Sequence, residues 1–226
     1  MKFIFFVLMC VSVLLSGCMS SLERKLHENI AEHREFVLYG KNDDMSVSLM
    51  CGVRESDYKI NGYATEIIEF GVLTVTIDSE NIVKENSEYI LFVGTEKYSG
   101  MFEINPFDES LVADIKEIVD KNANVSVVIK LESGDVALKL QNVDSDWVID
   151  SEDCFKIVAD KYKDELKKFI NNGNFEGEIY VKIMNDEKDL VEDFYFLISL
   201  YGRTGKSINI ILSPKTGEIL ASNTNV

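Results

Sequence analysis

The stretch VSVVIKLESGDVALKL (residues 125–140) shows what kind of structure most of this chain forms. Val125, Val127 and Ile129 lie at every second position, which is the period of a strand with one buried face. Ser133-Gly134 is a turn signal, and residues 136–140 repeat the β-favouring composition of the first half. The stretch therefore predicts an antiparallel hairpin with a short turn.

Similar runs rich in β-branched and aromatic residues precede this hairpin. They lie at Phe36–Tyr39, Ser46–Cys51, Ala64–Glu69, Val72–Ile77, Tyr89–Val93 and Tyr98–Ile104. Between the last run and the hairpin, Leu111, Ile115, Ile118 and Val119 form one helical face, so we expect a helix over about 108–121. Residues 36–143 are thus predicted to be a mainly antiparallel β domain with one helix.

The segment after residue 143 changes character. Residues 144–150 are acidic and contain the lone Trp147, and we place a domain boundary there. Ser151 is the predicted N-cap of an amphipathic helix that runs to about Ile170. Strands follow at Glu178–Met184, Phe194–Tyr201, Ser207–Leu212 and Ile219–Ala221. The predicted fold class is α+β, with a second domain (151–224) in which a helix packs on a three- to four-stranded antiparallel sheet.

Charge limits the classes of partner. The chain carries 39 acidic and 23 basic residues, a formal net charge of −16. Nucleic acid and anionic lipid surfaces would repel such a chain, so both are excluded as binding surfaces. High solubility is the simplest consequence of this charge.

An apolar run over residues 3–15 follows Lys2 and is too short to span a bilayer as a helix. It closes with Leu15-Ser16-Gly17-Cys18, which resembles the lipobox of bacterial lipoproteins. The resemblance implies a signal peptide (1–17) cleaved between Gly17 and Cys18, and a diacylglycerol on the Cys18 thiol. It also implies attachment to the extracytoplasmic face of the cell membrane through that lipid. An ordinary cleaved signal and a short buried strand are the alternatives. Residues 18–35 are predicted to be a tether or a short helix, since Leu22, Leu26 and Ile30 form one helical stripe.

Two further resemblances concern the folded part. The hairpin Ile208–Leu220, with its turn Pro214-Lys215-Thr216-Gly217, resembles the last hairpin of the PepSY domain, a small extracytoplasmic module. That resemblance implies one helix before a curled antiparallel sheet, no catalytic residues, and a role in restraining secreted peptidases. Residues 52–75 are similar to uncharacterised surface lipoproteins of low-GC Gram-positive bacteria, which implies no activity.

Several motifs are candidate sites. The loop 202–207 has Leu200 where a phosphate-binding loop needs glycine, so a hairpin turn is expected. The acids of 144–153, and Asp186, Glu187 and Asp189, lack the EF-hand pattern, so for each cluster a solvated loop or a helix N-terminus is expected rather than a Ca²⁺ site. Cys51 and Cys154 are expected to be two buried free thiols rather than a disulfide. Weak candidates for exposed recognition residues are Tyr58, Tyr63 and Tyr98.

Histidine catalysis is not expected, because His27 and His33 both fall in the predicted tether. We therefore assign no catalytic residue, no metal ligand and no cofactor. The expected function is a non-enzymatic lipoprotein that binds a protein or a cell-wall component. The alternative is a PepSY-type inhibitor or regulator of a secreted peptidase, and a carboxylate-based hydrolase ranks below it.

Overall fold

A computed structural model describes residues 20–56, 59–78, 84, 86–116, 119–185 and 194–226. Strands dominate these residues, and the three helices among them are short: α2 (Ser21–His27), α3 (Asp153–Lys161) and α4 (Lys163–Lys167). The strands are β1 (Ile30–Lys41), β2 (Met45–Glu55), β3 (Ile67–Ile77), β4 (Glu88–Val93), β5 (Glu96–Met101), β6 (Glu103–Ile104), β7 (Leu111–Ile115), β8 (Val125–Leu131), β9 (Gly134–Asn142), β10 (Ile170–Asn171), β11 (Asn174–Phe175), β12 (Gly177–Asn185), β13 (Phe194–Gly202), β14 (Ser207–Leu212) and β15 (Ile219–Asn225).

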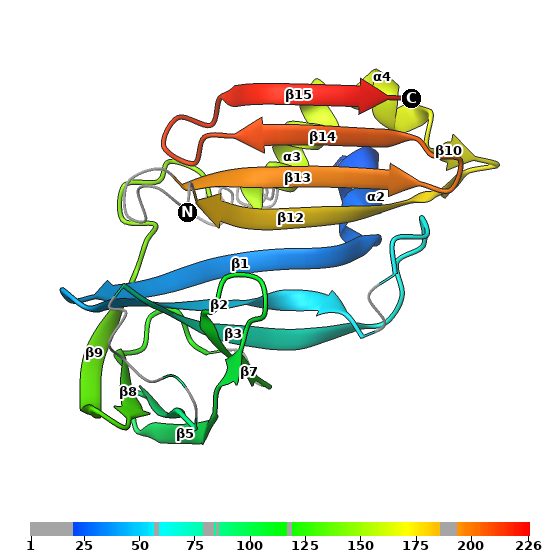
Figure 1. Cartoon of the computed structure of the whole chain (residues 1–226). Coiled ribbons are helices and arrows are strands. Elements are labelled where there is room, and N and C mark those ends of the chain that lie inside the picture. The colour runs from blue at the N-terminus through cyan, green and yellow to red at the C-terminus, as the bar shows by residue number, and fades with distance from the viewer. Residues whose placement is uncertain (1–19, 57–58, 79–83, 85, 117–118, 186–193) are drawn as a thin grey trace, which may run out of the picture.

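One sheet runs through both halves of the chain, in the order β15-β14-β13-β12-β1-β2-β3-β7-β6 (Figure 1). Its strand pairs are antiparallel except for β1 and β12, which are parallel and join the N-terminal strands to the C-terminal ones. The predicted α+β class is therefore wrong. Of the described residues, 55% lie in strands and 11% in helices, so the protein is mostly β there, and β12–β15 do not form a separate small sheet under a helix.

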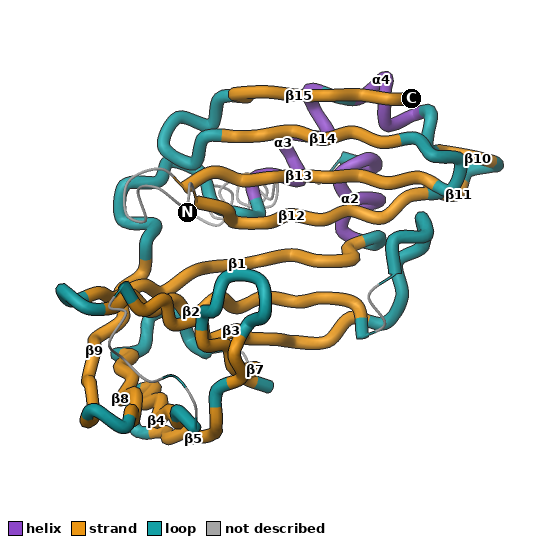
Figure 2. Tube along the Cα trace, in the orientation of Figure 1, coloured by secondary structure: helices purple, strands orange, loops and turns teal. Residues whose placement is uncertain are grey.

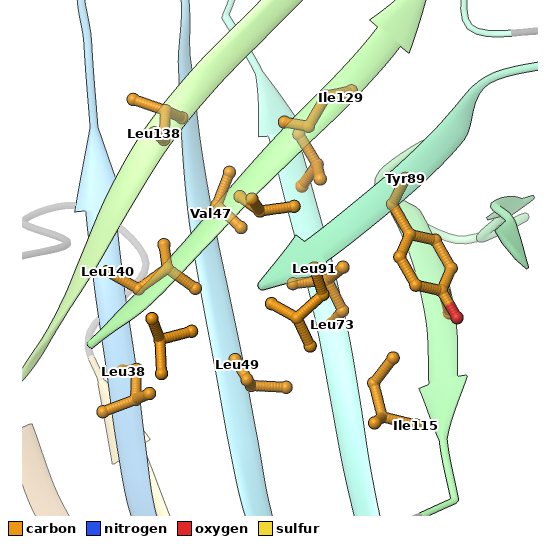
Figure 3. Packing of buried hydrophobic residues seen from close by; sticks show 14 of the residues in the cluster. Leu38, Val47, Leu49, Leu73, Tyr89, Leu91, Ile115, Ile129, Leu138 and Leu140 are labelled. Carbon is orange, nitrogen blue, oxygen red and sulfur yellow. The ribbon is translucent and has the colours of Figure 1, made fainter. Parts of the chain in front are cut away.

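The first hydrophobic cluster lies between β1, β2, β3 and β7 on one side and β4, β8 and β9 on the other. Strand β9 pairs with both β8 and β1, so the sheet folds back over itself and becomes nearly closed. Figure 3 shows Leu49 and Leu73 facing Leu91 and Leu140 across this layer. The alternation that predicted the hairpin over 125–140 supplies the inward-facing side chains of β8, so that prediction is confirmed.

The second hydrophobic cluster lies between β12–β14 and the helices. In Figure 2, α2, α3 and α4 lie against one face of these strands. Phe155 and Val158 of α3 and Leu166 of α4 are fully buried against Ile198 and Ile210 of the sheet. The helix predicted for 151–170 is thus present as two shorter pieces, and β12, β13 and β14 agree closely with their predicted ranges.

The helix predicted for 108–121 is absent from the described part of that range, 108–116 and 119–121. Residues 111–115 make strand β7, which pairs with β3 and β6. Leu111 and Ile115 are four apart, so they satisfy a helical period, but Leu111, Ala113 and Ile115 also satisfy the period of a strand. Residues 111–115 pair with β3, and this long-range pairing determines their conformation in place of the helical period.

The segment predicted as a tether is also ordered from Ser20. Ser20 and Glu23 form a capping box at the start of α2. Leu22 and Leu26 of α2 are buried in the second cluster, and β1 already begins at Ile30. The expectation that both histidines lie outside the folded part is therefore wrong. No helix among the described residues is long and apolar enough to cross a membrane.

Candidate functional site

A cavity of about 450 Å³ lies where β1 meets the two segments that follow β7 and β9. It is the best candidate for a binding site, because it is lined by an unusual number of carboxylates together with the single tryptophan of the chain. Its lining residues are His33, Glu35, Phe36, Val119, Asp120, Lys121, Asn122, Asn142, Asp144, Trp147, Asp150, Ser151 and Glu152.

A β-bulge in β1 brings one wall of the cavity into place. The pairing register between β1 and β2 shifts between Arg34 and Phe36, so that Glu35 is the extra residue. A bulge bends its strand and redirects the side chains next to it. Here His33, Glu35 and Phe36 all line the cavity, although strict alternation would send Phe36 to the opposite face from Glu35.

His33 and Ser151 connect β1 to the start of α3. The His33 Nε2 and Ser151 Oγ atoms are 2.9 Å apart, and Ser151 Oγ donates to the carbonyl oxygen of Glu35 at 3.2 Å. Which of the two groups donates depends on the tautomer of the His33 ring. Burial, followed by the charge of His27, lowers the pKa of His33 to about 4, so the ring is neutral at physiological pH. The contact joins β1 to the start of α3.

The structure also corrects the predicted N-cap. Ser151 does not cap α3, since its hydroxyl is used by His33 and Glu35. The N-cap is Glu152, which makes no side-chain cap hydrogen bond. Asp150 satisfies the first N–H groups instead, because its Oδ1 accepts from the backbone N–H of Glu152 and of Asp153, each at 3.0 Å. The N-cap therefore lies one position after the predicted one.

The electrostatics of the cavity favour a positive ligand. Five of its lining residues are acids (Glu35, Asp120, Asp144, Asp150 and Glu152), against Lys121 as the one Lys or Arg. Burial raises the pKa of Glu35, and the nearby charges of Glu152 and Glu69 raise it further, while Lys121 lowers it. Like charges held close together in a partly desolvated site disfavour ionisation. A bound cation would relieve this repulsion.

Trp147 forms an aromatic wall beside these acids. Its ring packs edge-on against Phe196 with centroids 5.3 Å apart, and lies 6.0 Å from the ring of Phe194. The side chain is only partly buried, so one part of the ring stays accessible from the cavity. An aromatic face next to carboxylates is a suitable surface for an ammonium or guanidinium group.

A second cavity, of about 210 Å³, opens between β1, β2, β3 and the end of β12. Its walls carry hydroxyl groups (Tyr39, Ser46, Ser48, Thr74 and Thr76) and the guanidinium of Arg34. Arg34 is already engaged, because its Nε donates to Glu32 Oε1 at 2.6 Å. This smaller cavity therefore offers fewer uncommitted charged groups than the first.

The other predicted sites have clear outcomes where the structure describes them. Cys51 and Cys154 are free and buried, as predicted. Burial raises the pKa of the Cys51 thiol to about 11 and that of Cys154 well above its usual value, so neither is a reactive thiolate. The loop over 203–206 is a β13–β14 hairpin turn, also as predicted. Within the described residues, no group of three or more His, Cys, Asp or Glu could hold a metal ion.

The structure describes only some of the predicted recognition and lipidation residues. Tyr63 is exposed, with the Arg203 guanidinium 3.0 Å from its ring centroid, whereas Tyr98 is half-buried against the first cluster. The signal and lipidation residues Gly17 and Cys18 lie outside the described residues, as do Tyr58 and the acids Asp186, Glu187 and Asp189. Sequence reasoning missed His33, because the strand that carries it was taken to begin at Phe36.

Comparison with known proteins finds no matching family model, and no curated protein or solved structure with significant similarity.

Proposed function

We propose that this chain is a lipid-anchored extracytoplasmic binding protein, and that the cavity beside Ser151 holds a positively charged group of its protein or cell-wall ligand. The observation that carries the second part is the lining of that cavity, with five carboxylates and Trp147 against one lysine. The anchoring part is supported by the lipobox-like residues 15–18.

Specificity for cations follows from the same lining. An ammonium or guanidinium group that enters the cavity gains from several carboxylates and from the Trp147 ring. An anionic ligand meets the opposite field, and a neutral one loses water from the carboxylates without recovering hydrogen-bond donors. The cavity volume of about 450 Å³ has room for a side chain or a small amine rather than for a whole domain.

The single tryptophan provides the test. Fluorescence of the 20–226 fragment, which holds every described residue, is titrated with tetralysine, with tetralysine acetylated on its side chains, and with tetraglutamate. Only unmodified tetralysine is expected to change the Trp147 emission, with saturation and with an affinity that falls as salt rises. The Asp144→Asn variant should bind about tenfold more weakly, an effect of the order expected for one charge-assisted contact.

Asp135→Asn is the matched control, because it makes the same change of charge on β9, away from the cavity. It should bind tetralysine as the wild type does. Equal weakening by both variants, or equal binding of acetylated and unmodified peptide, would show that the cavity is not the binding site. Metabolic labelling with a fatty acid, compared between the wild type and Cys18→Ser, tests the anchor separately.

A peptidase regulator is a second candidate. The order of elements favours it. The PepSY resemblance implies a helix followed by an antiparallel sheet, and here α3 and α4 are followed by the antiparallel strands β12–β15. Inhibition of a peptidase secreted by the same cell, tested with purified protein, would support this candidate over a purely adhesive one.

A carboxylate-based hydrolase is favoured by one observation, the raised pKa of Glu35 inside a cavity that also holds Asp144 and Asp150. It predicts glycosidase turnover that Glu35→Gln abolishes. We rank it below binding because more of the lining, five carboxylates and Trp147, supports a cation-binding role.

A further inference from the structure

We propose that the free edge of β15 pairs, antiparallel, with β15 of a second copy of this chain, so that one sheet runs through both copies. Strand β15 is the last strand in the sheet order and bonds along one side to β14. All seven of its residues are exposed. Its outer row of backbone N–H and C=O groups is therefore open to another strand.

The two other strands that end the large sheet, β5 and β6, are protected, and this contrast carries the inference. Strand β5, at the end of the branch through β4, carries Glu96 and Lys97. Strand β6, at the opposite end of the main sheet, is only two residues long. Short edges and edges with charges resist pairing with another chain. Strand β15 has the sequence ILASNTN, without a charge or a proline.

The regular part of β15 is complementary to itself. Leu220 is an extra residue opposite β14, which leaves Ala221–Asn225 as a regular strand about 17 Å long. A two-fold axis at Asn223 would place Ser222 opposite Thr224 of the second copy, and Asn223 opposite its own equivalent. Small uncharged side chains of this kind form favourable cross-strand pairs.

The charges near β15 neither drive nor prevent this pairing. Lys206, beside the end of β15, is engaged within its own chain, because its Nζ donates to the carbonyl oxygen of Lys168. The net charge of −16 opposes association at long range, but salt screens charges beyond about 8 Å. Pairing therefore depends on the backbone and on the small side chains of β15.

The contact is small. Interfaces below about 1,200 Å² are typical of weak complexes, so pairing is expected at the density of a membrane-attached protein and not in dilute solution. Only the expected density of the chain at the membrane rests on the lipid anchor proposed above. The pairing itself does not depend on the acidic cavity.

Cross-linking of the full-length chain in cells tests the proposal. Asn223→Cys should give a disulfide-linked species of twice the chain mass on mild oxidation, because equivalent residues across the axis lie within about 5.5 Å. Ser133→Cys, exposed in the β8–β9 turn, is the control and should give at least tenfold less. The native Cys51 and Cys154 are buried and should not contribute. Fractionation of the same cells reports anchoring independently.

One further variant separates specific pairing from chance collision. Adding Thr224→Lys to Asn223→Cys should abolish the dimer, because it places a charge on the pairing edge of each copy. The proposal is overturned if single cysteines at 221–225 cross-link no better than the control, if the product has the mass of a different protein, or if Thr224→Lys leaves the dimer unchanged.

Discussion

Replacing Leu26 by alanine tests whether the segment before β1 belongs to the folded body. Leu26 is fully buried in the second cluster, where α2 contacts α3. Truncating a buried leucine removes its transfer free energy and leaves a cavity, a total cost of about 2–5 kcal/mol. A leucine in a solvated tether would cost less than about 0.5 kcal/mol. The two interpretations therefore predict clearly different losses in the free energy of unfolding.

Chemical and thermal unfolding of the 20–226 fragment measures this difference. For a body of about 200 residues, a loss of 2–5 kcal/mol lowers Tm by about 4–20 °C. Ile60→Ala is the control, because Ile60 is 60% exposed and should change the free energy of unfolding by less than about 0.5 kcal/mol. If Leu26→Ala and Ile60→Ala have the same small effect, α2 does not pack in the core and the tether interpretation returns.

Three other outcomes follow from the structure. Burial raises the pKa of Glu178, and the charge of Glu55 raises it further. Around this pKa the folded state binds more protons than the unfolded state. The free energy of unfolding therefore falls as pH rises from about 4.5 through the folded pKa. Glu178→Gln should flatten that part of the stability–pH curve, and exposed Glu218→Gln should not. Gly62 has φ +80°, and a Cβ there would lie 2.6 Å from the Arg203 backbone nitrogen. Gly62→Ala should therefore lower the free energy of unfolding by about 2–4 kcal/mol. Gly94 also has a positive φ but has open space around it, so Gly94→Ala should lower it by about 1 kcal/mol. Cys51 and Cys154 should react with a thiol reagent only at the rate of unfolding, and a fast phase in the native protein would contradict their burial.

The strands were predictable where alternation and turn residues agree. Residues 125–140 and 207–212 satisfy both signals, and they form β8, β9 and β14. The error at residues 111–115 arose because Leu111 and Ile115 satisfy two periods at once, and nothing local decides between them. The pairing of β7 with β3 decided it, and that contact is distant in the sequence.

The candidate site was less predictable than the fold. Its acids Asp144, Asp150 and Glu152 stand out in the sequence, but as a loop they indicate only solubility. They become a site because Glu35 and His33 lie opposite them, across more than 100 residues of chain. The bulge that directs Glu35 and Phe36 into the cavity has no local sequence signal, since it is a property of the pairing between β1 and β2.

Strand β1 explains why the predicted division at residue 36 hides the site. Phe36 and Leu38 belong to the first cluster, whereas Val37 between them belongs to the second. The same strand pairs with β2, β9 and β12, so it holds both clusters together. Because the cavity is built on the bulge of this shared strand, its carboxylates come together only when both clusters are formed. Unfolding of either cluster should therefore abolish binding, so ligand and stability are linked across the whole body.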